Sequence, residues 1–75
     1  YVFGGEWWID EGDGGVYADV WEYDPRQDKW RACAAMPRPR HGLGAVALDD
    51  GIYVVGGASG PSEQGLTAYL DRFVP

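Results

Sequence analysis

The chain has 75 residues, 45% of them hydrophobic, and it carries 12 acidic against six basic residues, a formal net charge of −6. This length allows one small domain at most, and the hydrophobic content is too high for a disordered chain. The acidic balance argues against nucleic acid and against an anionic membrane surface, because both are bound through clustered Lys and Arg. We therefore expect neither a nucleic-acid nor a membrane partner.

The secondary structure is expected to be all-β. Apolar runs are short, rich in β-branched and aromatic residues, and bounded by Gly, Pro and Asp, and no long window has a helical period. Six strands are predicted, over Tyr1–Phe3, Tyr17–Tyr23, Trp30–Cys33, Gly44–Leu48, Ile52–Val55 and Ala68–Val74.

The segments between these strands have recognisable turn and loop chemistry. Asp24–Lys29 predicts a type I turn, with Pro25 setting φ and Asp24 capping the turn with its side chain. Asp50-Gly51, between two apolar runs, predicts a hairpin turn. Two prolines make Met36–Arg40 an extended connector. Long loops are expected from Gly4 to about Val16 and over Gly56–Thr67.

Two segments of the chain recur at an interval of about 50 residues. The opening run YVFGG, Tyr1–Gly5, matches YVVGG at Tyr53–Gly57, and VWEYDP at Val20–Pro25 matches LDRFVP at Leu70–Pro75 in its aromatic residue and its proline. A repeat of this length in an all-β chain is typical of propeller blades rather than of helical solenoids.

With these residues identified, the chain resembles the kelch repeat. That pattern has an apolar strand closed by a glycine pair, a variable loop, and then a spaced Tyr and Trp. The stretch YDPRQDKW is close to the family form, and MPRPRHGLGAVALDDGIYVVGG continues it into a second copy, in which Phe73 takes the Tyr position. We expect the motif residues to be structural, because the glycines permit sharp turns and close backbone approach and the large aromatic rings suit the gap between packed sheets. They are Gly4, Gly5, Tyr23, Trp30, Gly56 and Gly57.

The resemblance implies a partial kelch-type β-propeller of about one and a half four-stranded antiparallel blades. Residues 1–35 would supply strands two to four of one blade, and residues 36–75 strands one to three of the next. The remaining blades of the propeller are then the first expected partner. An end after a third strand fits the C-terminal end of a longer propeller, so truncation is expected at the N-terminus only. The stretch HGLGAVALDDGIYVVGG also resembles bacterial kelch proteins labelled galactose-oxidase-like.

In that arrangement three loops would open on one face, because the connections between strands two and three and between strands four and one lie on the same side. They cover residues 6–16, 36–43 and 58–67. The first loop holds Trp7 and Trp8 among acidic residues, and aromatic rings beside hydrogen-bonding groups suit the recognition of a peptide or a sugar. Alternatively, one ring packs on the neighbouring blade and the other covers loop backbone.

The connector supplies the polar candidates of this face. Arg40 occupies the Pro-Arg position of the family pattern and is expected to anchor loop carbonyls or acidic side chains. Arg38 could receive a carboxylate. His41 lacks a second His or Cys at ligand spacing, so it predicts a hydrogen bond to the backbone rather than a metal ligand or a base.

No complete catalytic or metal-binding constellation is visible. Asp10, Glu11 and Asp13 lack the alternate spacing of a calcium loop, since the alternate positions are glycines. The single cysteine, Cys33, excludes an internal disulfide and fits a small buried hydrophobic residue. Galactose oxidase, a kelch-type enzyme, uses copper and a cysteine-linked tyrosine, and this chain has no His pair for copper. We expect no cofactor.

The sequence thus predicts a non-catalytic interaction surface that binds a protein or peptide, or a carbohydrate. Its expected contact residues are Trp7, Trp8, Arg38, Arg40 and His41. The alternative is a part of a carbohydrate-active propeller enzyme, either a galactose-oxidase-like oxidase or a sugar mutarotase. Neither the compartment nor the ligand follows from the residues.

Overall fold

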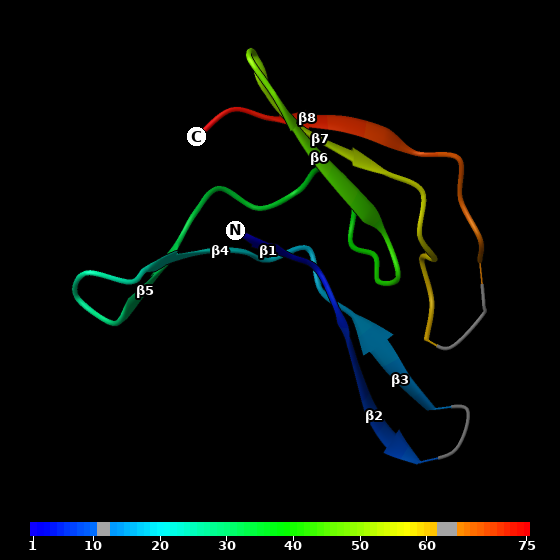
Figure 1. Cartoon of the computed structure of the whole chain (residues 1–75). Coiled ribbons are helices and arrows are strands. Elements are labelled where there is room, and N and C mark those ends of the chain that lie inside the picture. The colour runs from blue at the N-terminus through cyan, green and yellow to red at the C-terminus, as the bar shows by residue number, and fades with distance from the viewer. Residues whose placement is uncertain (11–12, 62–64) are drawn as a thin grey trace.

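The computed structural model describes residues 1–10, 13–61 and 65–75, which form eight strands in three antiparallel sheets (Figure 1). The described residues contain no helix, which confirms the all-β prediction. Accordingly, no helix among them is long and apolar enough to cross a membrane. The strands are β1 Val2–Phe3, β2 Glu6–Asp10, β3 Asp13–Val16, β4 Val20–Asp24, β5 Lys29–Ala32, β6 Gly44–Leu48, β7 Gly51–Val55 and β8 Leu70–Phe73.

The first sheet has the order β1-β4-β5. Val2 pairs with Trp21, and Tyr23 pairs with Trp30 across the β4–β5 hairpin. The turn of this hairpin is capped as predicted, because the backbone N–H of Arg26 donates to Asp24 Oδ1 at 2.9 Å.

The second sheet has the order β6-β7-β8. Leu48 pairs with Gly51 across a tight turn, and Ile52 pairs with Phe73. Gly51 has φ +143°, and a Cβ there would lie 2.8 Å from the carbonyl oxygen of Phe73. The turn therefore depends on glycine at this position, as the Asp-Gly signal predicted.

The third sheet is a hairpin that the sequence did not predict. The segment from Gly4 to about Val16 was expected to be a loop, and this is wrong: Glu6–Asp10 of β2 pairs with Asp13–Val16 of β3, with an irregular register between Trp8 and Asp10. Gly14 and Gly15 of β3 lie opposite Trp8 and Trp7 of β2. In Figure 1 the hairpin projects away from the two larger sheets.

Two strands are shorter than predicted, because backbone groups at their ends bond to neighbouring loops. Strand β4 begins at Val20 rather than Tyr17, since Tyr17 N–H donates to the Gly5 carbonyl and Ala18 O accepts from Met36 N–H. Strand β8 begins at Leu70, and Tyr69 O accepts from Gly56 N–H.

The core lies between the first and second sheets. Val20 of β4 and Val54 of β7 are each 1% exposed, and Met36 of the connector packs with them. The ring of Phe3 meets that of Phe73 edge-on, with centroids 5.4 Å apart. These contacts hold the two sheets face to face, and Cys33 packs at the margin of the same cluster.

The outward faces of both sheets are apolar and exposed. On the first sheet, Val2, Trp21 and Trp30 line an open recess of about 360 Å³, and Trp30 is 57% exposed. On the second, the exposed residues are Val46, Leu48, Val55 and Leu70. Surfaces of this kind normally mark contacts with another part of a protein.

We predict that the isolated chain associates, because both outward faces expose apolar surface to water. Sedimentation velocity should show a mass that rises with concentration, and replacing Leu48 by Lys should lower the association. A monodisperse monomer with a sharp thermal transition would contradict this expectation.

A pH dependence follows from the β6–β7 turn. Tyr53 Oη donates to Asp50 Oδ2 at 2.8 Å and Arg72 Nη1 lies 3.2 Å from the same oxygen, and the Tyr53 hydrogen bond, more than Arg72, lowers the pKa of Asp50. A lowered folded-state pKa stabilises the fold above the ordinary value of about 3.9, and this contribution is lost as the pH falls through the folded-state pKa.

Tyr53→Phe should therefore raise the pKa of Asp50 towards its ordinary value, as measured by a carboxyl-detected NMR titration. Asp49, the neighbouring turn residue, serves as the internal control. An unchanged Asp50 titration would show that the hydroxyl does not set this pKa.

Candidate functional site

Both glycine pairs lie where a strand ends and the chain following β5 passes close to it. Gly4 and Gly5 have φ of +65° and +120°, and Gly56 and Gly57 have +69° and +92°. A Cβ on Gly57 would lie 2.6 Å from the carbonyl oxygen of His41, and one on Gly4 would clash with the carbonyl oxygen of Arg40. Glycine is therefore needed at positions 4 and 57 for both backbone conformation and space, and at positions 5 and 56 for backbone conformation.

Arg40 is the residue at which these segments meet. Its carbonyl accepts from Gly5 N–H at 3.0 Å, and its own N–H donates to Tyr17 O at 3.1 Å. Its side chain is fully buried; Nη1 donates to Gly56 O at 3.2 Å and Nη2 to Asp71 Oδ2 at 2.8 Å. One residue thus joins the base of the β2–β3 hairpin to the second sheet.

Arg38 converges on the same carboxylate. Its Nη2 lies 3.0 Å from both oxygens of Asp71, and its guanidinium carbon lies 3.7 Å from the centre of the Tyr69 ring. The Asp71 side chain is 19% exposed, and those of Arg38 and Arg40 are 41% and 0% exposed. A carboxylate between two guanidinium groups compensates charge that would be costly to bury alone.

Asp71 and Tyr69 were not among the residues that the sequence singled out. Asp71 is 31 and 33 positions from its two arginines, and no local pattern marks such a pair. The sequence did single out Arg38 and Arg40 of the connector. Their shared acceptor, Asp71, can be identified only from the position of β8 beside the connector.

His41 joins the other two loops. Its Nε2 lies 2.9 Å from the carbonyl oxygen of Gly60, and Nδ1 lies 3.5 Å from Glu6 Oε1. Its backbone also exchanges two hydrogen bonds with Ala58. The side chain is 15% exposed, so it serves as a link between the hairpin base and the 58–67 segment.

The two tryptophans stand on the hairpin itself. Trp7 pairs with Gly15 and Trp8 with Gly14. The indole of Trp7 covers Gly15 so closely that a Cβ there would lie 2.7 Å from the ring. Trp7 is nevertheless 39% exposed, Trp8 47% and Ile9 68%, so the hairpin presents apolar surface to solvent.

The structure thus brings residues 6–16, 36–43 and 58–67 together at their bases, in the parts that it describes. Glu11 and residues 62–64 lie outside the described residues. The arginines lie on the side of the connector that faces β8, whereas the tryptophans lie on the projecting hairpin.

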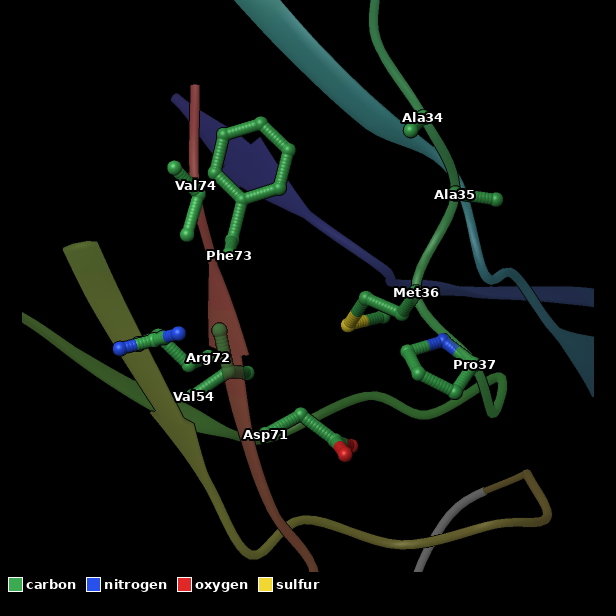
Figure 2. A pocket seen from close by; sticks show the side chains of 9 residues that line it. All are labelled: Ala34, Ala35, Met36, Pro37, Val54, Asp71, Arg72, Phe73 and Val74. Atoms are coloured by element: carbon green, nitrogen blue, oxygen red, sulfur yellow. The ribbon is translucent and has the colours of Figure 1, made fainter.

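A pocket of about 230 Å³ lies between the connector and β8 (Figure 2). Met36 and Pro37 face Phe73 and Val74 across it, and Asp71, at one end, is already held by the two arginines. No three His, Cys, Asp or Glu side chains of the described residues are grouped so as to hold a metal ion. The pocket offers apolar contact and little chemistry.

Comparison with known proteins gives the family. The family model of the Kelch motif matches residues 1–37. The chain belongs to the kelch-repeat family. Kelch-like protein 34 of Homo sapiens is 42% identical over 81% of this chain, Kelch-like protein 25 of Xenopus laevis 40% over 76%, and Beta-scruin of Limulus polyphemus 38% over 96%. The kelch prediction is confirmed, and with the strand content it identifies the chain as part of a propeller fold.

The relatives bear on the choice between an interaction surface and a carbohydrate-active enzyme. They are Kelch-like proteins and a scruin, and they do not support the galactose-oxidase-like resemblance or the carbohydrate-active enzyme alternative. The chain spans 10% of the length of Kelch-like protein 34, 9% of that of Kelch-like protein 25 and 7% of that of Beta-scruin. No solved structure gives a significant match.

The burial of Arg40 leads to a prediction about stability. Asp71→Ala should lower the free energy of unfolding by about 3 kcal/mol or more, because it leaves the guanidinium of Arg40 buried without its counter-charge. Arg31→Ala, which removes an exposed ion pair with Glu22 at 2.7 Å, should change the free energy of unfolding much less, because water screens such pairs. Equal losses in urea denaturation would contradict the assigned role of Asp71.

Proposed function

We propose that the chain forms part of a protein-binding surface of a kelch propeller, with the β2–β3 hairpin as its main contact element. The surface consists of residues 6–16, 36–43 and 58–67. The observation that carries the proposal is the pair of tryptophans, 39% and 47% exposed, on a hairpin that projects from the sheets. Exposed aromatic residues on a supported element are typical of the centres of protein interfaces.

The proposal divides the sequence-predicted residues by role. Trp7 and Trp8 would contact the partner. Arg40 and His41 would position the loops, since their side chains are buried or nearly so and bind Gly56, Asp71 and Gly60 within the chain. Arg38, which is more exposed, could add a polar contact at the margin of the surface.

We also propose how the two large sheets fit the parent propeller. Residues 1–35 would carry strands two to four of one blade and residues 36–75 strands one to three of the next. Support comes from the sheet orders β1-β4-β5 and β6-β7-β8, from the face-to-face core, and from the exposed outward faces, which neighbouring blades would cover. Kinship with Kelch-like proteins and scruins supports an interaction role.

Trp8→Ala should weaken partner binding by about tenfold or more, because truncating a central interface aromatic costs about 2 kcal/mol. The free energy of unfolding should change by no more than about 1 kcal/mol, since the side chain is half exposed. Trp7→Ala should likewise leave stability nearly unchanged, and a large loss would assign Trp7 to the fold.

The measurement is site-specific photo-crosslinking in the full-length protein. A crosslinker at Ile9, on the hairpin, should capture partner peptides, and Trp8→Ala should strongly reduce this capture. A crosslinker at Gln27, in the β4–β5 turn, is the control. Equal capture from both sites, or capture unaffected by Trp8→Ala, would contradict the proposed surface.

A further inference from the structure

The hairpin has backbone edges available for another strand. Strands β2 and β3 pair with each other, and among the described residues neither pairs with a third strand. An unpaired edge offers a row of backbone donors and acceptors, and a two-stranded hairpin gains stability from a third strand. Some peptide-binding proteins use an exposed sheet edge of this kind to add a strand from a partner.

The exposed Trp8 makes β2 the better edge. Successive side chains of a strand point to opposite faces, so Trp7 and Trp8 place one indole on each face of β2. The Trp7 indole is turned towards β3, over Gly15, so a segment running beside β2 would meet the exposed Trp8 with one of its two side-chain rows. Strand β3 has the sequence DGGV, and its glycines at 14 and 15 offer no comparable contacts.

The charge of the hairpin selects a basic partner. Asp10 of β2 lies directly opposite Asp13 of β3, and like charges in such a pair repel each other. None of the ion pairs within the described part of the chain involves either aspartate. Four of the six basic residues are held in ion pairs elsewhere: Arg31, Arg38, Arg40 and Arg72.

We propose that the β2–β3 hairpin binds an extended, basic peptide segment of a protein partner, which adds as a third strand along β2. Apolar side chains and Lys or Arg stems of the segment lie against Trp8, where a cation is attracted to the ring face. Its basic groups relieve the repulsion between Asp10 and Asp13. This inference rests on the proposed function and gives that surface a partner chemistry.

The test measures fluorescence anisotropy of labelled peptides titrated with the full-length protein. A peptide of alternating Lys and Val should bind with an affinity at least about tenfold higher than that of the matched peptide of alternating Glu and Val. A Lys and Val peptide with interspersed prolines should bind weakly, because proline removes the donors that a strand needs. Binding should weaken as salt is raised.

Matched variants locate the binding. Asp10→Asn with Asp13→Asn should weaken the Lys and Val peptide several-fold, and so should Trp8→Ala. Asp19→Asn with Asp49→Asn removes the same charge from exposed positions outside the hairpin and should leave binding unchanged. Near-UV circular dichroism of each variant verifies that the fold is retained.

Several results would overturn the inference. They are equal binding of the acidic peptide, equal binding of the proline-containing peptide, equal effects of the two double variants, and no binding of any peptide. The crosslinking from Ile9 is independent of these outcomes. Capture there that depends on Trp8, without a preference for basic peptides, would retain the interaction surface and reject the basic strand.

Discussion

The arrangement of the two large sheets and the hairpin base depends on the contacts of Arg40, whose guanidinium is buried. It belongs to the connector between the two large sheets, yet its backbone bonds to Gly5 and Tyr17 and its side chain to Gly56 and Asp71. A fully buried cation must be compensated by a carboxylate and by hydrogen bonds. The position of the connector therefore determines the positions of both strand ends and of the hairpin base.

This constraint explains the division between supporting and exposed residues. The glycine pairs lack side chains where the connector passes, and His41 extends the same support to Gly60. With its base fixed in this way, the β2–β3 hairpin can expose Trp7 and Trp8 without contributing to the core between the sheets. Substitutions at the exposed positions of the hairpin should therefore cost the fold little.

The sequence predicted those parts that depend on local chemistry. Strand content, the Asp24 cap and the kelch pattern all rest on short runs or on spacing within one repeat. The β2–β3 hairpin was missed because Gly14 and Gly15 are typical of a loop. In the fold, Gly14 leaves room for the backbone of Trp7 and Gly15 for its indole. Asp71 was missed because its partners are distant in sequence, and only the placement of β8 beside the connector brings them together.

The most direct test of this account is hydrogen exchange in the Asp71→Asn variant, followed by NMR at single amides. The amides of Gly5 and Tyr17, at the hairpin base, should exchange faster together with that of Gly56, because all three lie next to groups that Arg40 holds. The amide of Arg31, in the β4–β5 ladder, should be much less affected. Faster exchange confined to β8, with the hairpin base unchanged, would contradict the central role of Arg40.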